Sequence, residues 1–178
     1  MALYFLDTEF IEYPNSIELI SIGIVSDDGR EYYAISSEYD YDHASMWVKS
    51  NVIKPIYKDI YRNVRSNKYK IEVFHKYEGK SIKTIASEIL DFVGFPDYKQ
   101  GKPEFWGYFS SYDWVVFCWI FGTMLNLPEG FPMYCNDLQQ LLVHYNLAKL
   151  PDPVGEHNAL IDAKWNKVLY EYIMDEIN

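Results

Sequence analysis

The hydrophobic positions of the chain follow two periods, one typical of strands and one typical of helices. Five short segments are apolar on both faces or alternate with a period of two, which predicts strands. An Asp28-Gly29 turn joins the second strand to the third, so residues 18–38 are expected to form a hairpin. The expected strands are 2–9, 17–29, 30–38, 104–109 and 132–137.

Five further segments have the composition or the period of helices. In residues 81–94 an apolar stripe lies between an N-cap, Ser81, and a C-cap, Gly94. Residues 43–57 suggest a short helix that stops near Pro55, because the residue before a proline disfavours helix. The other expected helices are 110–126, which is largely apolar and therefore buried, 138–146, and a last one from about 159 with Ile161, Trp165, Val168, Leu169, Tyr172 and Ile173 as its apolar side.

Three strands followed by alternating helices and strands imply an α/β fold with a mixed sheet. The 178 residues are about the size of one ordinary domain and contain no repeat, low-complexity tract or interdomain linker. We therefore expect a single domain over residues 1–178, with a basic insert at about 39–80. In such sheets ligands bind at the strand ends, where Asp7 and Glu9 are expected.

The charge of the chain is unevenly distributed. A net charge of −10 argues against a broad, sequence-independent grip on long nucleic acid. The segment from Lys54 to Lys83 is nevertheless basic, at +6, which leaves −16 for the remainder. This segment is either a solvated face or a track for RNA phosphates, and the repulsion elsewhere would confine a substrate to that track.

Several features indicate a protein without metal-bound cysteines or membrane spans. Cys118 and Cys135 lie in apolar surroundings without metal-ligand spacing, which is typical of buried thiols. The chain begins directly with a strand, shows no signal-peptide pattern and has no stretch that approaches a membrane span, so a cytoplasmic location is the simplest expectation. His43, His75 and His144 have no acids grouped around them and are interpreted as structural.

The first strand ends in two acids that share one face. Asp7 and Glu9 are two residues apart, so their carboxylates lie close together and repel unless a proton or a cation lies between them. Such a pair alone is a weak signal, because surface strands often carry one. The apolar run before it strengthens the interpretation as a metal site.

Two later segments supply further candidates. Asp113 in "FSSYDW" has the position of a helix-start acid behind a Ser110 or Ser111 cap, yet it follows a strand expected beside the first and can also face Asp7. In "GEHNALIDAKW", His157 precedes Asp162 by five residues, nearly one and a half turns, so the two would not share a helix face. His157 is therefore expected in the loop or first turn. The alternative is an exposed loop histidine and a solvated acid.

Taken together, four carboxylates and one histidine provide what two-metal phosphodiester cleavage requires. Carboxylate oxygens can hold two Mg²⁺ ions about 3.5 to 4 Å apart, which clamp the attacking and leaving oxygens. A neutral imidazole can take the proton of the attacking water. The expected metal ligands are Asp7, Glu9, Asp113 and Asp162.

The segments "FLDTEF", "FWGYFSSYDW" and "EHNALIDA" resemble, in this order, the three motifs of the DEDDh family of 3′-5′ exonucleases. "HNALID" matches the family's H-x-A-x-x-D signature, and "ELISIGIV" is similar to its second strand. The resemblance spans about Leu3 to Asn166 and is strongest to small stand-alone bacterial and phage 3′-5′ exoribonucleases, and more distant to RNase T and oligoribonuclease. It implies an RNase H-like fold, a five-stranded mixed sheet with helices on both faces.

The resemblance also implies roles for the site residues. Asp7 and Asp162 would bridge two Mg²⁺ ions, with Mn²⁺ as a substitute. Glu9 would bind the ion that activates water, Asp113 would hold the other, directly or through water, and His157 would be the general base. The substrate contacts that it suggests are Phe10 and Ile11, with Glu18 and Leu19. Tyr108 is a further candidate, as an aromatic residue that could stack on a base.

The function that this resemblance implies is a 3′-5′ exoribonuclease that acts on single-stranded RNA 3′ ends and releases nucleoside 5′-monophosphates. A DNA 3′ exonuclease, a phosphodiesterase of small nucleotides and a catalytically silent binding module remain alternatives. Trp47, Tyr108 and Phe109 could stack on bases or fill a core or dimer interface. A homodimer is suggested by the family, but no interface is readable from the sequence.

Overall fold

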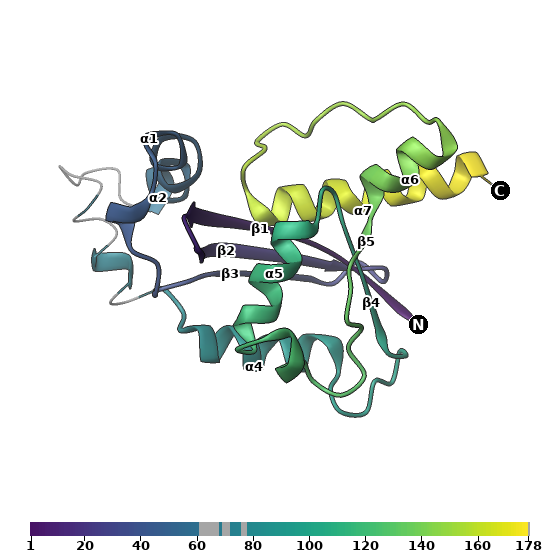
Figure 1. Ribbon diagram of the computed structural model, residues 1–178, viewed down its shortest axis with the longest axis horizontal. Coiled ribbons are helices and arrows are strands. Elements are labelled where there is room, and N and C mark those ends of the chain that lie inside the picture. The colour runs from purple at the N-terminus through teal and green to yellow at the C-terminus, as the bar shows by residue number, and fades with distance from the viewer. Residues whose placement is uncertain (61–67, 69–71, 76–77, 178) are drawn as a thin grey trace.

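The protein folds into a five-stranded sheet with helices on both faces (Figure 1). The structure is a computed structural model that describes residues 1–60, 68, 72–75 and 78–177. The strand order is β3-β2-β1-β4-β5; β1, β2 and β3 are antiparallel neighbours, and β4 is parallel to β1 and β5. The predicted mixed sheet is confirmed. The strands are β1 (Ala2–Tyr13), β2 (Ser16–Ser26), β3 (Glu31–Ile35), β4 (Pro103–Gly107) and β5 (Asn136–Asp137).

Side chains along β1 alternate between the two faces of the sheet. Tyr4 and Leu6 are buried in the core beneath α4 (Ile82–Val93) and α5 (Ser111–Ile120), whereas Phe5 is buried against α6 (Leu138–Tyr145) and α7 (Ala159–Ile177). This alternation continues at the end of the strand. Asp7 and Glu9 therefore face α7, and Thr8 faces α5, with the two helix layers on opposite sides of the sheet in Figure 1.

The predicted hairpin is present as β2 and β3, with shorter strands than expected, and β1 and β2 form a second hairpin that was not predicted. Asn15 and Gly29, in the two turns, have left-handed backbones with φ of 64° and 88°. The pairing of β1 and β2 shifts register after Glu9, because Glu9 pairs with Ser21 but Phe10 pairs with Leu19. A β-bulge thus lies directly beside the acids, where bulges commonly redirect side chains.

The prediction that a helix stops near Pro55 is wrong. Helical structure continues from α1 (Met46–Val48) through a π-helical turn (Lys49–Ile53) into α2 (Lys54–Ile60). Pro55 is in the first turn of α2, and the widened turn before it lets the Lys54 N–H bond to the carbonyl of Lys49. The π turn accommodates the proline ring, which an unbroken α-helix would not. The basic residues Arg62, Arg65, Lys70 and Lys76 lie outside the described residues.

The helix over 81–94 is confirmed, with the Ser81 hydroxyl capping Thr84 N–H and Gly94 in a left-handed C-cap. The helix expected over 110–126 ends earlier, at Ile120, and a separate 3-10 turn covers Met124–Asn126. Gly122, with φ of 101°, provides the reversal between them. The fourth and fifth strands are also shorter than predicted. No helix of the described residues is long and apolar enough to cross a membrane.

Helix α7 approaches the sheet closely through small and polar residues that the apolar pattern missed. A Cβ at Gly23 on β2 would lie 2.2 Å from the Ala159 carbonyl oxygen, so only glycine fits there. Asn166 is buried and donates from Nδ2 to the Leu6 carbonyl at 2.9 Å. Val168, predicted on the apolar side, is exposed. These contacts fix the start of α7 over the end of β1.

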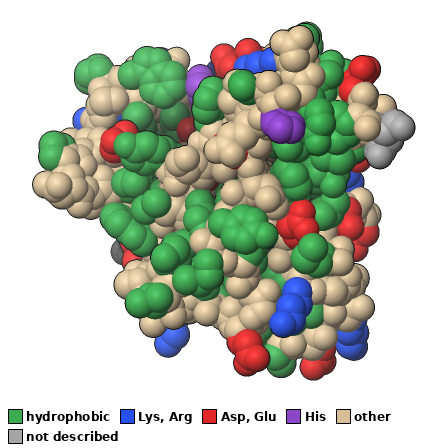
Figure 2. All heavy atoms as spheres, turned by 45° about the vertical axis from the view of Figure 1, so that its right-hand side comes forward, with side chains coloured by type: hydrophobic (Ala, Val, Ile, Leu, Met, Phe, Trp, Pro, Cys, Tyr) green, Lys and Arg blue, Asp and Glu red, His purple; other side chains and the backbone are tan. Residues whose placement is uncertain are grey.

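Hydrophobic side chains also remain on the surface. Figure 2 shows a face on which they gather and on which Lys and Arg are few. Exposed large hydrophobic residues in α5 and the 3-10 turn after it are Tyr112, Val115, Trp119, Met124 and Leu125.

Candidate active site

Three of the predicted carboxylates meet at the end of β1. Asp7 and Glu9 project from the strand, and Asp162 comes from the first turn of α7. Ligand oxygens of the three lie within 4.8 Å of one another, a separation that one metal ion can span. The interpretation of Asp7 and Glu9 as part of a cluster with Asp162 is thus consistent with the geometry.

The electrostatics of this cluster disfavour three free anions. Burial, then the charges of Asp113, Glu9 and Asp162, raise the pKa of Asp7 well above its usual range. Burial, then the charges of Asp162 and Asp113, raise the pKa of Glu9 to about 8. Among the described residues, no Lys or Arg lines the pocket around them. A divalent cation would supply the missing positive charge, and the hard oxygen donors suit Mg²⁺ or Mn²⁺.

Asp113 lines the same pocket but is held by a different partner. It lies in the first turn of α5, nearly buried, and one carboxylate oxygen accepts hydrogen bonds from the Thr8 N–H at 2.9 Å and the Thr8 hydroxyl at 2.6 Å. Burial raises the pKa of Asp113 to about 6, although the Thr8 bonds oppose this. Of the two caps considered, Ser110 occupies the N-cap position, but its side chain makes no capping hydrogen bond. Asp113 therefore locks α5 to β1 and leaves its other oxygen for a further contact.

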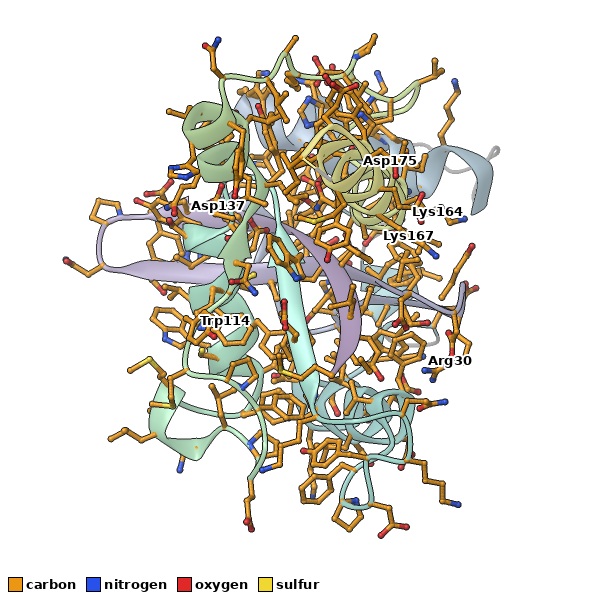
Figure 3. The ribbon with its side chains drawn as sticks, turned by 90° about the vertical axis from the view of Figure 1, so that its right-hand side faces the viewer. Arg30, Trp114, Asp137, Lys164, Lys167 and Asp175 are labelled. Atoms are coloured by element: carbon orange, nitrogen blue, oxygen red, sulfur yellow. The ribbon has the colours of Figure 1, made fainter. Side chains whose placement is uncertain are left out.

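A residue that sequence reasoning missed supports the turn before Asp113. Asp137 lies at the end of β5 and the start of α6, as Figure 3 shows. Its Oδ1 caps the N–H groups of Gln139 and Gln140, and its Oδ2 accepts from the Ser110 N–H at 2.8 Å. The pattern of an acid before "LQQLL" signals the cap, but nothing local signals the bond to Ser110.

His157 lies in the loop before α7, as the spacing to Asp162 predicts. Its backbone is left-handed, with φ of 67°, and it follows Gly155, with φ of 89°. Asn158, also missed, accepts from Leu160 N–H and Ile161 N–H at 3.2 Å and donates its own N–H to Asp162 Oδ2 at 3.1 Å. This reciprocal cap orients the Asp162 carboxylate and places His157 at the pocket.

Aromatic side chains form another part of the pocket wall. Phe10 stacks on Tyr112 with ring centroids 5.9 Å apart, and Tyr108 packs edge-on against Phe109 and Trp165 at 4.7 and 5.1 Å. All five line the pocket that contains the acids. Two predicted substrate contacts, Phe10 and Tyr108, are therefore at the site.

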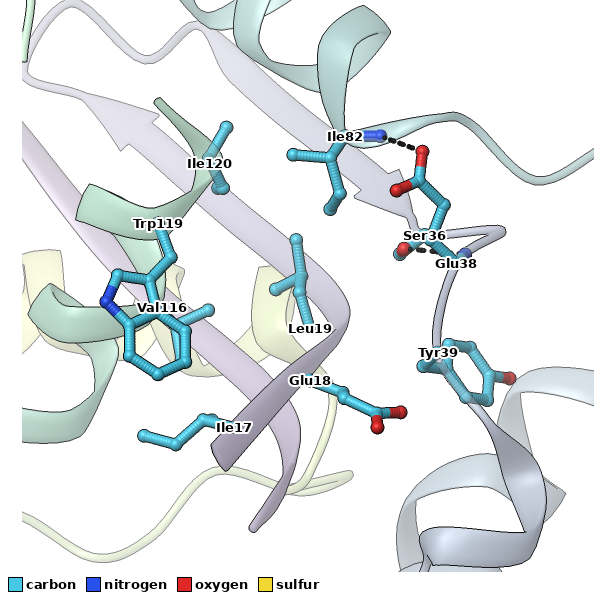
Figure 4. A pocket seen from close by; sticks show the side chains of 10 residues that line it. All are labelled: Ile17, Glu18, Leu19, Ser36, Glu38, Tyr39, Ile82, Val116, Trp119 and Ile120. Atoms are coloured by element: carbon cyan, nitrogen blue, oxygen red, sulfur yellow. Dashed lines mark hydrogen bonds between the residues drawn. The ribbon is translucent and has the colours of Figure 1, made fainter. Parts of the chain in front are cut away.

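The other three predicted substrate contacts do not line this pocket. Ile11 is buried in a core cluster with Ile20. Glu18 and Leu19 line a separate pocket beside Trp119 (Figure 4). The Glu18 carboxylate there accepts from Tyr13 Oη at 2.7 Å and from the Asp40 N–H at 2.6 Å, and it pairs with His43 Nδ1 at 2.7 Å.

Comparison with known proteins identifies a family that this sequence matches. A sequence model described as the 3′-5′ exoribonuclease Rv2179c-like domain matches residues 2–174. The 3′-5′ exoribonuclease Rv2179c of Mycobacterium tuberculosis is 34% identical over 165 residues, which cover 90% of this chain and 86% of the relative.

Two solved structures share the fold at low identity. A full-length 3′-exonuclease superimposes with a TM-score of 0.55 and 11% identity, over 98% of this chain and 82% of that one. Cell-death related nuclease 4 superimposes with a TM-score of 0.54 and 9% identity, over 98% of this chain. The chain spans 64% of the length of that nuclease. The fold is thus the RNase H-like fold.

Proposed function

Because the chain belongs to the Rv2179c-like 3′-5′ exoribonuclease family, we propose that it removes nucleotides from the 3′ end of single-stranded RNA by two-metal hydrolysis and releases nucleoside 5′-monophosphates. The observation that carries the metal dependence is the approach of Asp7, Glu9 and Asp162 within 4.8 Å, with no described Lys or Arg lining their pocket. Mg²⁺ is the proposed ion, and Mn²⁺ substitutes.

Each acid has a position suited to its proposed role. Ligand oxygens of Asp7, Glu9 and Asp162 lie within 4.8 Å of one another, so Asp7 and Asp162 would hold both ions and Glu9 would hold the ion that activates water. One carboxylate oxygen of Asp113 is bound by Thr8. The other oxygen would be a ligand of the second metal ion. When bound, the ions stabilise charge on the attacking and leaving oxygens.

His157 is the proposed general base. Its imidazole lines the pocket beside the acids, and a neutral imidazole can accept the proton of the attacking water. The hydrogen bond from Asn158 N–H to Asp162 ties the histidine loop to a ligand residue, so proton transfer and metal binding share one rigid turn.

The aromatic wall suits single-stranded substrates. Phe10 and Tyr108 are proposed to contact the terminal nucleotides, because aromatic faces stack on unpaired bases of any sequence. Ile11, Glu18 and Leu19 support these contacts from behind, through the packing of β1 and β2. The acidic pocket repels a phosphate backbone that is not accompanied by cations, which favours short or terminal segments.

Two further properties are proposed with the activity. The exposed hydrophobic residues of α5 and the turn after it offer a surface for a homodimer. The unpaired thiols of Cys118 and Cys135 suit the reducing cytoplasm.

The test compares a 5′-labelled single-stranded RNA with the matching DNA, in Mg²⁺, Mn²⁺ or chelator, beside Asp7→Ala. The expected result is a ladder that shortens from the 3′ end of RNA and is absent with chelator or with the variant. An equally fast DNA ladder would extend the activity to DNA. Binding without cleavage under all conditions would overturn the proposal in favour of a silent module.

A further inference from the structure

Trp47 reaches the candidate active site from a segment far away in the chain. It belongs to α1, and the residue is 54% exposed although its ring contacts His157. The indole and the His157 imidazole are edge to face, with ring centroids 4.8 Å apart and planes at 81°. Such T-shaped contacts are favourable because the positive edge of one ring meets the negative face of the other.

The backbone of Trp47 is firmly held even though its ring is partly exposed. The Ser45 hydroxyl caps the Val48 N–H, and Asn51 Nδ2 donates to the Trp47 carbonyl at 2.9 Å. One π turn later, Val52 and Ile53 are fully buried in the core cluster that includes residues of β1 and β2. The indole is thus presented from an element anchored on the sheet itself.

The imidazole of His157 has few other fixed partners. Its nearest charged group is Glu156, whose Oε1 lies 3.9 Å from Nε2, beyond hydrogen-bonding distance. Among the described residues, no hydrogen bond to the ring is present. Its backbone has a left-handed φ of 67°, a conformation that surrounding contacts must maintain in a residue other than glycine.

We propose that Trp47 is a positioning residue for His157: the edge-to-face contact selects the imidazole rotamer that points into the pocket. The inference rests on the proposed function, because it assigns Trp47 a role through the proposed base. Trp47 touches no reacting atom in this role. It raises the fraction of molecules in which the His157 imidazole already points into the pocket before substrate binds.

The contrasting role for an exposed indole here is a platform for a nucleobase. Trp47 also lines a groove with Glu9 and Phe10, so the two roles need different readouts. A platform contributes to substrate binding and its loss raises KM. A positioning contact contributes to the readiness of the base, and its loss lowers kcat at unchanged KM.

The decisive experiment is a double-mutant cycle on Trp47→Ala and His157→Ala in steady-state RNA hydrolysis. We expect Trp47→Ala to lower kcat roughly threefold to tenfold, the range of one aromatic contact, with KM unchanged. In the His157→Ala background the same substitution should have no further effect. Trp47→Phe should restore most of the rate, and Met46→Ala, a change at the exposed neighbour in α1, should have none.

A second measurement does not depend on turnover. In the metal-free protein, the His157 imidazole NMR signals should move on Trp47→Ala through loss of the ring current, and should stay in place on Met46→Ala. Equal effects of Trp47→Ala with and without His157, a change in KM alone, or unmoved imidazole signals would overturn the inference. If His157→Ala itself left kcat unchanged, the proposed general base would fail instead, so the two failures are distinguishable.

Discussion

Thr8 donates twice to one oxygen of the Asp113 carboxylate, from its N–H at 2.9 Å and from its hydroxyl at 2.6 Å. Thr8 stands between Asp7 and Glu9 but faces the opposite side of the sheet, so the strand holds two acids on one face and binds a third from the other. The arrangement makes the position of Asp113 depend on a residue that carries no charge. Its partner atoms are nearly buried, so water replaces a lost bond poorly.

Thr8→Val is expected to lower the free energy of unfolding by about 1 to 2 kcal/mol, because it removes a buried hydroxyl donor to a carboxylate. It should also raise the pKa of Asp113 above about 6, since the Thr8 bonds hold it down. Urea denaturation in chelator and NMR titration of the carboxyl carbons measure the two effects. Thr8→Ser keeps the hydroxyl and should restore both values. An unchanged pKa in Thr8→Val would show that the hydroxyl does not stabilise the charged form.

The acid cluster predicts a pH dependence for the metal-free protein. The pKa of Glu9 is about 8 in the folded state against 4.5 unfolded, and that of Asp7 is also raised. The folded state therefore binds more protons, and the associated stability, fully present below about pH 4.5, is lost as the pH rises through 8. We expect the Tm in chelator to fall between pH 5 and pH 8 (about the titration range) and added Mg²⁺ to reverse the fall.

Asp7→Asn is the matched variant for this effect, because it removes one charge with little change in shape. It should raise the Tm in chelator at about pH 8, flatten the pH profile and abolish the Mg²⁺-dependent increase. Differential scanning calorimetry measures all three. A variant that melts below the parent in chelator would show that the Asp7 charge does not destabilise the metal-free fold.

A second pH dependence distinguishes Glu18 as a structural residue. Burial opposes its ionisation, but bonds from Asp40, Tyr13 and His43 lower the pKa of Glu18, and the bond to Glu18 raises the pKa of His43. The folding stability that the ionised Glu18 contributes is lost as the pH falls through its lowered pKa. The folding stability that protonated His43 contributes is fully present below about pH 6.5 and is lost as the pH rises through its raised pKa.

Glu18→Gln should therefore lower the Tm most at about pH 6, where both partners are charged, and less at about pH 3 and pH 9. Glu12→Gln, at an exposed residue of the same hairpin, should change the Tm little at any pH. A loss of equal size at every pH would mean that the charge on the pair does not contribute.

The sequence was sufficient to predict features whose interacting residues belong to the same helix or strand. The stripe of α4 and its Ser81 and Gly94 caps are readable because each partner lies within a few positions. The pairing of Asp7 and Glu9 follows from strand alternation alone. The alternation of helices and strands after β3 indicates parallel strands beside an antiparallel hairpin, which explains why the mixed sheet was predictable.

The features that were missed depend on contacts between distant segments. Pro55 is tolerated because a π turn precedes it, and no local pattern indicates that turn. Asn166 is a polar residue that the sequence pattern would place at the surface. It is buried instead, because its side chain donates a hydrogen bond to the Leu6 carbonyl. Ile11 follows the acids in sequence, but the bulge after Glu9 and the alternation of the strand direct it into a core cluster.

Gly23 sets the distance between α7 and the sheet, and Gly23→Ala tests it. The added Cβ would lie 2.2 Å from the Ala159 carbonyl oxygen, so α7 must move away from β2. We expect a loss of about 3 kcal/mol or more in unfolding free energy, from overpacking against backbone. The Mg²⁺-dependent rise in Tm should also shrink, because Asp162 moves with the helix start. Gly29→Asn is the control, since its turn is open and asparagine tolerates positive φ. Similar melting of both variants would contradict the close-packing argument.

Lys149 joins the histidine loop to the aromatic wall. Its Nζ lies 5.0 Å from the Tyr108 ring centroid and 5.2 Å from that of Trp165, and it pairs with Asp152. Trp165 Nε1 also donates to the Pro151 carbonyl at 2.8 Å, so the charge and the indole hold the same loop. Cation–π contacts at partly exposed sites contribute about 0.5 to 1 kcal/mol each, whereas an exposed ion pair contributes less.

Lys149→Met keeps the aliphatic stem and removes the charge, so it isolates these contacts. We expect a loss of about 1 kcal/mol in unfolding free energy and faster amide exchange in residues 150–157, because the loop opens more often. Lys164→Met is the matched control: Lys164 also forms an exposed ion pair, 2.8 Å from Glu31, but no cation–π contact is present for it among the described residues. Its substitution should change stability by less than about 0.5 kcal/mol and leave loop exchange unaltered. If the two variants behaved alike, the rings beneath Lys149 would have no role in holding His157 at the pocket, and the hydrogen bond from Trp165 would remain as the loop's anchor.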